Sequence, residues 1–393
     1  MKKYYKEPKY YSQFSCIGSE CPNNCCHGWR IDWMQDEYNK LINSGVSLEI
    51  KNIADSSFSY DEKTNYYSIV FAEDNFCPFL SKNDGLCNIQ RSMGEEYISL
   101  VCRTYPRRFF ERDNIIVRFC DTSCFRVIEM LGNDKDAAKL ELLEAHDNSK
   151  RVDNNVLHFD SVHKVNLSPY LRFRLEILGF YSDLFNSSDN IENSIILGAL
   201  AANKISDCSE KNDVIISVIN KYRCQFNDKN IMTSLDEITT DYKIKFLIIN
   251  NVIIKYLKSD SIKKNISLLH NGNELIESNY TCGKENFNSA FGKKKYFIRN
   301  VSANAFYDLF MNENLTKRPF WDFYIYFSFC ISAIQVIAYS IGFINDNIAE
   351  KFILALSDFC RDTMHNVENA NDIIDDIKKL GIKTPGHIAL IIK

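Results

Sequence analysis

The distribution of cysteine is the feature that most constrains how this chain can fold. Nine of its 14 cysteines lie within the first 124 of 393 residues, where an even distribution would place about four. The other five are isolated along the rest of the chain. The clustered thiols are Cys16, Cys21, Cys25, Cys26, Cys77, Cys87, Cys102, Cys120 and Cys124. These nine are the candidate metal ligands, and a subset of about four is expected to bind the metal directly.

The cellular compartment decides what such thiols do. The chain begins Met1-Lys2-Lys3-Tyr4-Tyr5, which carries charge but no apolar core, so we expect no secretory signal and a cytoplasmic protein. Thiols stay reduced in the cytoplasm, which favours metal ligation over a disulfide framework. Zinc takes four tetrahedral ligands from Cys and His, whereas an iron–sulfur cluster takes four cysteine thiolates, or three when one iron is left open. Nine thiols exceed one site, so the remainder would support the ligands, stabilise the fold or bind a second centre.

Charged neighbours of the cysteines allow two interpretations. Five arginines lie in the cysteine-containing stretch: Arg103, Arg107, Arg108, Arg112 and Arg118. They would offset the negative charge of a thiolate-bound cluster, or they would form a solvated basic face partly paired with Glu111 and Asp113. His27 follows the cysteine pair and is either a metal ligand, a hydrogen-bond donor to one, or an ordinary turn histidine.

Composition narrows the class of protein. With 45% hydrophobic residues, 25% charged residues and a net charge of -4, the chain is globular, and its slight acidity argues against nucleic-acid binding. Residues 323–345 carry no charge and are long enough to cross a bilayer. Gln335, several serines and three tyrosines dilute this stretch, so we interpret it as a buried central helix and expect no membrane association.

The expected fold is mainly α. Residues 1–130 form a cysteine-rich metal-binding region with short strands at Tyr66–Phe71 and Ile115–Phe119 and a helix at Ile89–Val101. Residues 131–393 form a predominantly helical domain, in which Ser168 followed by Pro169 marks a helix start. Further helices are expected at 191–203, 212–223, 241–258, 302–312, 320–342 and 347–365. The isoleucine-rich stretch 241–258 also fits a buried strand, and the polar stretch 258–290 is expected to be a loop or hinge.

Linked motifs around the cysteines carry a family resemblance. They are Cys16-x4-Cys21-x3-Cys25-Cys26-His27-Gly28-Trp29, Cys77-Pro78-Phe79-Leu80, Gly85-Leu86-Cys87-x-Ile89, Gly94, Cys102-x2-Tyr105-Pro106-Arg107 and Cys120-x3-Cys124. In order and composition they resemble the flagellin lysine-N-methylase family, within a wider group of zinc- or iron-chelating cysteine-cluster domains. Beyond residue 130 no specific motif matches, and the resemblance extends there by continuity.

This resemblance implies an activity and two cofactors. It implies methyl transfer from S-adenosylmethionine to surface lysines of flagellin, in the cytoplasm before export. It also implies an iron–sulfur cluster near the active site, with [4Fe-4S] the expected form and zinc the alternative. Flagellin is then the protein partner, and neither nucleic acid nor membrane is expected as one.

The implied reaction sets demands that the motifs do not meet in a familiar way. A lysine has a pKa of about 10.4, so its proton must be removed before the nitrogen can attack. The C-x3-C-x2-C pattern of radical chemistry is missing, because Gly28 and Val127 stand where its third cysteine would be. A glycine-rich cofactor loop is missing as well. We therefore expect the cofactor beside the cluster, with an open iron holding its methionyl amine and carboxylate. The catalytic and cofactor-binding residues stay unassigned.

Two non-enzymatic alternatives fit the same cysteines. One is an iron–sulfur or zinc-binding sensor or adaptor whose helical part binds a partner. The other is a zinc-stabilised interaction protein. Methyl transfer from labelled S-adenosylmethionine distinguishes the enzyme from both.

Overall fold

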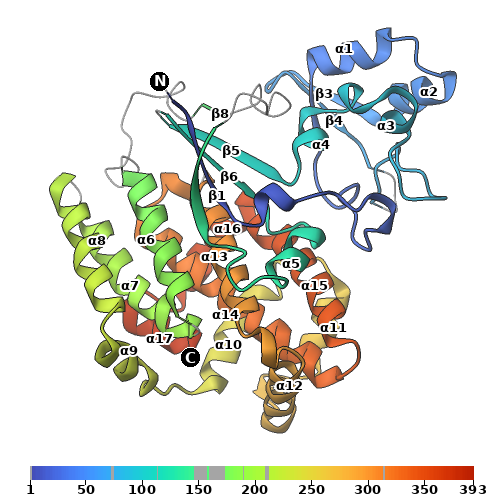
Figure 1. Ribbon diagram of the computed structural model, residues 1–393. Coiled ribbons are helices and arrows are strands. Elements are labelled where there is room, and N and C mark those ends of the chain that lie inside the picture. Colours follow the sequence, from blue (N-terminus) through green and yellow to red (C-terminus); the bar gives the residue numbers. More distant parts are fainter. Residues whose placement is uncertain are drawn as a thin grey trace.

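The fold is mainly α-helical, as the sequence predicts. The computed structural model describes residues 2–71, 75–112, 114–145, 157–158, 173–188, 190–208, 212–312 and 315–393. Figure 1 shows a body of packed helices, a sheet at its upper edge, and a small group of helices and strands to one side. Most strands come from the first third of the chain.

The elements have the following bounds. The strands are β1 (Tyr4–Pro8), β2 (Asp32–Met34), β3 (Phe58–Asp61), β4 (Tyr66–Ile69), β5 (Arg107–Arg112), β6 (Ile115–Cys120), β7 (Leu140–Glu144), β8 (Leu157–His158), β9 (His270–Asn271) and β10 (Glu274–Leu275). The helices are α1 (Gln35–Asn43), α2 (Leu48–Ser57), α3 (Asn88–Met93), α4 (Leu100–Thr104), α5 (Phe125–Leu131), α6 (Arg174–Ser187), α7 (Ile191–Asp207), α8 (Asn212–Phe226), α9 (Lys229–Asp236), α10 (Tyr242–Ile253), α11 (Asp260–Ser267), α12 (Glu277–Ala290), α13 (Tyr296–Phe310), α14 (Phe320–Ile344), α15 (Ile348–Phe359), α16 (Val367–Lys379) and α17 (Pro385–Ile392).

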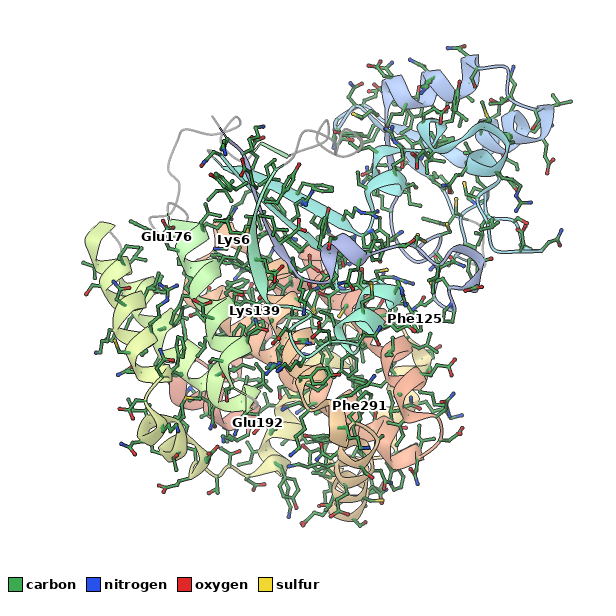
Figure 2. All side chains as sticks on the ribbon, viewed as in Figure 1. Lys6, Phe125, Lys139, Glu176, Glu192 and Phe291 are labelled. Carbon is green, nitrogen blue, oxygen red and sulfur yellow. The ribbon has the colours of Figure 1, made fainter. Side chains whose placement is uncertain are left out.

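A five-stranded sheet joins the N-terminus to the helices. Its order is β7-β1-β6-β5-β8, with β1 parallel to β6 and antiparallel to β7. At the end of β6, Asn304 of α13 donates a hydrogen bond to the Cys120 carbonyl over 3.0 Å. On β1, the Lys6 ammonium donates to the Leu175 carbonyl of α6 over 3.4 Å, and Figure 2 shows Lys6 close to Glu176 of the same helix. The sheet is therefore fixed to two helices of the body.

Two hydrophobic cores divide the described residues. The large core combines α5–α17 with apolar side chains of β5, β6 and the segment after β1. The second core lies around the antiparallel sheet β2-β4-β3 and includes Ile31, Trp33, Ile50, Phe79 and Ile98. We call residues 26–102 around this second core the small unit, and the residues around the large core the large unit. The division between the cores therefore does not fall near residue 130.

Helix α14 is the centre of the large unit. It is the one helix in the described part of the chain that is long and apolar enough to cross a membrane, and 89% of its most apolar window is buried inside the protein. Its serine hydroxyls donate to backbone carbonyls: Ser328 donates to the Tyr324 carbonyl over 2.9 Å, and Ser332 donates to the Ile391 carbonyl of α17. Such bonds let polar side chains enter an apolar core without loss of hydrogen bonding. The interpretation of 323–345 as a buried central helix is confirmed.

Most predicted elements are confirmed, and two are wrong. The strands at 66–71 and 115–119 and the six helices predicted between 191 and 365 are present, with 241–258 helical. The single helix expected at Ile89–Val101 is instead α3, a short 3-10 turn and α4, because Gly94 adopts φ +103 and ends α3. The helix start at Ser168 and Pro169 lies outside the described residues.

The loop expected at 258–290 is also wrong. This stretch forms α11, the β9–β10 hairpin and α12. Its polar composition reflects exposed helix faces, while Gly283 lets α12 approach α14 backbone to backbone. A methyl group on Gly283 would lie 2.0 Å from the Tyr339 carbonyl oxygen. Helix α12 therefore packs through a close backbone contact at Gly283. It lacks the apolar stripe from which a packed helix is usually predicted.

Candidate metal centre and adjoining cleft

Five of the nine clustered cysteines line one cavity in the small unit. The cavity has a volume of about 100 Å³, and its sulfur-bearing lining residues are Cys25, Cys26, Cys77, Cys87 and Cys102. Aromatic and aliphatic side chains, among them Trp29 and Tyr105, complete its wall. The donor set is therefore made of thiols in an otherwise apolar surrounding, which is the chemistry that zinc and iron–sulfur clusters select.

Backbone hydrogen bonds bring these distant cysteines together. The Cys77 amide donates to the Cys26 carbonyl over 2.7 Å, which joins the two cysteine loops. Leu80 forms an isolated bridge with Cys87. The hydroxyl of Ser99, which begins α4, accepts a hydrogen bond from the Cys102 amide over 3.2 Å. Short elements and turns, rather than long helices, thus place the thiols.

Cys25 is the thiol that interacts with all the others of the cavity. A hydrogen bond from Cys26 lowers the pKa of Cys25. Burial, together with the neighbouring thiols of Cys25, Cys77 and Cys87, raises the pKa of Cys102 to about 12. Burial likewise raises the pKa of Cys77 to about 12. Metal binding here would therefore displace protons from several thiols, because thiolates are the ligands.

The spacing of the thiols bears on which metal they suit. Among the described residues, no three Cys, His, Asp or Glu side chains converge on a single point that could hold a metal ion. A zinc ion needs four donors at about 2.3 Å from one centre. A cluster is a larger body whose ligands lie around it. The five thiols that line the cavity are donors that both zinc and an iron–sulfur cluster accept.

The remaining four predicted ligands do not line this cavity. Cys16 is exposed. Cys21 and Cys124 interact electrostatically with Cys25, and burial raises the pKa of Cys124 to about 12. Cys120 is fully buried in the large core, where its amide donates to the Tyr10 hydroxyl over 3.0 Å. The cysteine cluster of the sequence is thus divided between the cavity, its neighbourhood and the large core.

His27 has both ring nitrogens engaged by the protein. Its Nδ1 lies 2.9 Å from the Asn24 carbonyl, and its Nε2 lies 2.7 Å from Nη1 of Arg361. Burial and the Arg361 charge lower the pKa of His27. A neutral imidazole that donates through Nδ1 and accepts through Nε2 satisfies both contacts. The turn-histidine interpretation therefore fits the structure, and the metal-ligand interpretation does not.

A large polar cleft lies next to the cysteine cavity. It has a volume of about 1230 Å³ and shares Trp29 and Ile69 with the cavity wall. Residues of the small unit between 28 and 75 form one side, and residues of the large unit between 258 and 371 form the other. Its charged lining residues are Arg30, Lys258, Lys317, Arg318 and Arg361, against Asp61 and Glu368. The lining therefore carries an excess of positive charge.

A π-helical turn at Cys360–Met364 shapes the large-unit side of this cleft. The His365 amide closes it by donating to the Cys360 carbonyl over 2.9 Å. The turn points Arg361 toward the small unit, where its guanidinium contacts His27, donates to Asn23 Oδ1 over 3.0 Å and lies 5.5 Å from the Trp29 ring centre. Its buried Nε donor has no hydrogen-bond partner among the described residues. π-turns frequently mark functional sites.

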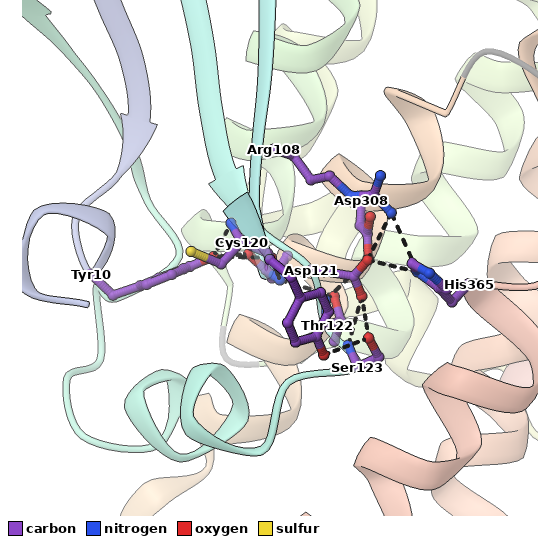
Figure 3. A network of polar contacts seen from close by, with 10 residues as sticks. Tyr10, Arg108, Cys120, Asp121, Thr122, Ser123, Asp308 and His365 are labelled. Carbon is purple, nitrogen blue, oxygen red and sulfur yellow. Dashed lines mark hydrogen bonds and ion pairs between the residues drawn. The ribbon is translucent and has the colours of Figure 1, made fainter. Parts of the chain in front are cut away.

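A buried network of charged groups lies behind the cleft (Figure 3). Asp121 accepts hydrogen bonds from Arg108 and His365 over 2.9 Å each, and from the Ser123 hydroxyl over 2.6 Å. Burial alone would raise the pKa of Asp121, but His365 and Arg108 hold it well below its usual value. Burial and the Asp121 carboxylate raise the pKa of Asp308 well above its usual value. Asp121 is thus the ionised member of the pair and Asp308 the neutral one.

The arginines of the cysteine-rich stretch do not form the solvated basic face that was one interpretation of the sequence. Arg108 pairs with buried Asp121, and Arg118 pairs with buried Glu7. Arg107 donates to the Phe14 carbonyl over 3.3 Å, and Arg103 lies 3.2 Å from Glu37. These guanidinium groups have specific partners within the protein. The side chain of Arg112 lies outside the described residues.

Sequence reasoning missed the polar residues of the cleft and of the buried network behind it. Asp121 stands between Cys120 and Cys124, and the cysteine pattern gives no reason to single it out. Arg361 and His365 come from a region without a motif. One signal was available: the polar run Arg361-Asp362-Thr363-Met364-His365 ends an otherwise apolar helical pattern.

Fold and site define a mainly α-helical protein with a thiol-lined cavity beside a large polar cleft. A family model described as the FliB lysine N-methylase C-terminal domain matches residues 184–391, which is more than half of the chain. The chain therefore belongs to the FliB lysine N-methylase family. No solved structure matches it at a significant level.

Curated relatives agree with this assignment. The flagellar biosynthetic protein FliU of Salmonella muenchen is 30% identical over 138 residues, which cover 34% of this chain and 80% of that protein. The lysine-N-methylases of Salmonella typhimurium and Salmonella choleraesuis are each 30% identical over 138 residues. This chain spans about a third of the length of those two proteins, with 34% of each aligned.

Proposed function

We propose that this protein is a cytoplasmic lysine N-methyltransferase that transfers a methyl group from S-adenosylmethionine to flagellin, with an iron–sulfur cluster in the cysteine cavity. Membership in the FliB lysine N-methylase family supports the reaction class. The name of one relative, a flagellar biosynthetic protein, supports flagellin as the substrate. The observation that carries the proposal is the shared wall of Trp29 and Ile69 between the thiol-lined cavity and the cleft.

The donors of the cysteine cavity support a [4Fe-4S] cluster as its occupant. Five thiols surround the cavity without converging on one point. Four of Cys25, Cys26, Cys77, Cys87 and Cys102 would hold the cluster, or three if one iron is left open. Cys25 and Cys26 are neighbours in sequence, so we expect only one of them to be a ligand. Zinc is the alternative occupant, and analysis of the purified protein for iron and zinc distinguishes the two.

The cleft fits S-adenosylmethionine by an unsatisfied donor. When bound, this cofactor supplies an electrophilic methyl group. Arg361 has a buried Nε donor without a partner among the described residues, and it lies at the cleft beside Trp29. A guanidinium recognises a carboxylate well, so Arg361 is the residue that would hold the methionyl carboxylate. Trp29 provides an aromatic face for a cationic sulfonium group.

A transfer assay tests the proposal directly. Protein purified without oxygen is incubated with methyl-labelled S-adenosylmethionine and unmodified flagellin, and labelled lysines are identified by mass spectrometry. We expect label on flagellin lysines and iron with acid-labile sulfide in the protein. Protein that carries a cluster but transfers no label to flagellin overturns the enzymatic proposal in favour of a sensor or adaptor.

A further inference from the structure

The geometry around His365 decides which of its two ring nitrogens faces the buried carboxylate. Nδ1 lies 2.9 Å from the Oδ2 atom of Asp121, whose side chain is only 2% exposed. An ionised carboxylate accepts only, so Nδ1 carries the hydrogen that faces Asp121, and Nε2 is the ring nitrogen that can accept a proton when the ring is neutral. No hydrogen bond to Nε2 of His365 is recorded among the described residues, and the side chain lines the cleft.

Asp121 is built to stay ionised while it holds this ring. It receives hydrogen bonds from Arg108 and from both the amide and the hydroxyl of Ser123. Ser123 in turn lies 3.1 Å from the Tyr105 hydroxyl, which belongs to the wall of the cysteine cavity. A buried, fully satisfied carboxylate both orients an imidazole and stabilises its protonated form.

His365 also lies where the cleft and the cavity meet. Its ring is 4.7 Å from the Trp29 ring, centre to centre, and Trp29 contacts both spaces. Trp29 packs edge-on against Tyr105 at 4.5 Å on its other flank. The His365 side chain thus lies at the border between the cysteine cavity, where the cluster is expected, and the open part of the cleft.

We propose that His365, oriented by Asp121, accepts the proton of the acceptor lysine in this cleft. The inference rests on the proposed methyltransferase function. The ammonium proton passes to Nε2 of His365, and the freed lone pair of the lysine nitrogen forms the new N–C bond. The sulfur keeps the electron pair of the broken S–C bond, and the product is a methylated ammonium. His365 then releases its proton to solvent.

The charges of the cleft assist this transfer. Asp121 and Arg108 contact the ring from β6 and β5, and Arg361 and Glu368 line the same cleft from the large unit. Cationic side chains outnumber acidic ones in the cleft, so the charged form of a bound substrate lysine is disfavoured there. Its pKa is therefore lowered. Proton loss from the substrate is therefore favoured before the ring accepts it.

His365→Asn is the variant that separates a chemical role from a structural one. Its amide can still donate to Asp121, but it cannot accept the lysine proton. We expect kcat to fall by about 10² to 10⁴-fold at pH 7 with little change in KM, the usual worth of a general base. The remaining rate should rise about tenfold per pH unit toward the lysine pKa of about 10.4, because only free amine then reacts. His270→Asn, in the β9–β10 hairpin, is the matched control.

A second measurement does not depend on turnover. With histidine labelled for NMR, addition of a lysine-containing flagellin peptide should shift the His365 ring signal and leave His270 unchanged. If the wild-type protein transfers the methyl group and His365→Asn has the same rate and pH profile, the role of His365 is overturned. The proposed function then stands. A wild-type protein that transfers no methyl group overturns both. An unshifted His365 signal at saturating peptide overturns the placement of the lysine.

Discussion

Cys102 and Cys120 are both thiols of the cysteine-rich region, yet their surroundings predict opposite phenotypes. Cys102 lines the cavity, whereas Cys120 is fully buried in the large core. Cys102→Ser should lose most of the bound iron, measured as iron per chain and as cluster absorbance. Cys120→Ser should keep its iron but lose roughly 1–3 kcal/mol of stability, because a hydroxyl replaces a thiol in an apolar site. Exposed Cys224→Ser is the matched control, and equal iron loss in all three variants would contradict this assignment.

Single residues of the site were predictable only where they belong to a local sequence pattern. The cavity cysteines belong to a dense pattern, and five of the nine candidates line one cavity. Arg361 and His365 contact residues more than 240 positions away, with sequence separations of 334 from His27 and 244 from Asp121. Nothing in a local window encodes such pairings, because they depend on how two units dock.

At the scale of elements, the contact between α12 and α14 makes a sharp prediction. Each helix has a glycine at the crossing, and a methyl group on Gly342 would lie 2.1 Å from the Gly283 carbonyl oxygen. Gly283→Ala should therefore destabilise the protein by roughly 1–3 kcal/mol, as overpacking does, although alanine normally stabilises a helix by about 1 kcal/mol over glycine. Gly386→Ala in α17, where the nearest atom is 3.8 Å away, should leave stability unchanged or slightly higher. Denaturant unfolding measures both, and equal midpoints would refute the crossing.

The same contact shows why elements were predicted unevenly. Long apolar stretches such as α14 can be predicted as buried helices from their composition, since only a core can accommodate them. α12 is mostly polar and packs through a small residue, so periodicity gave no signal and a loop was expected. Helix α3 ended early because of one glycine in a positive-φ conformation. Fold class followed from pattern, whereas details of packing did not.

At the scale of the whole molecule, the charge of the cleft predicts substrate preference. Five cationic side chains and two acidic ones line it. A peptide with glutamates flanking its lysine should have a several-fold lower KM than one with glutamines, because opposite charges attract across the cleft. Raising the salt from about 0.01 to 0.15 M should reduce this difference, as the screening length falls from about 30 to 8 Å. Steady-state kinetics on the matched peptides decide, and a salt-independent KM ratio near one would reject the preference.

Whole-molecule organisation was the part least accessible from sequence. A boundary near residue 130 followed from the end of the cysteine pattern, but β5, β6 and the segment after β1 contribute side chains to the large core. The cleft depends on the docking of the small unit against α16 and the π-turn that precedes it. Hydrophobic patterning says which faces are buried, not which buried faces meet.

The split origin of the two cleft walls has an evolutionary consequence. One wall comes from residues 28–75 and the other from residues 258–371, so a gene fission between residues 102 and 258 would leave the cavity cysteines on one product and His365 on the other. Neither fragment alone would hold a complete site. Descendants that retain only one part are therefore free to drift toward new roles, since selection for the original chemistry no longer acts on them.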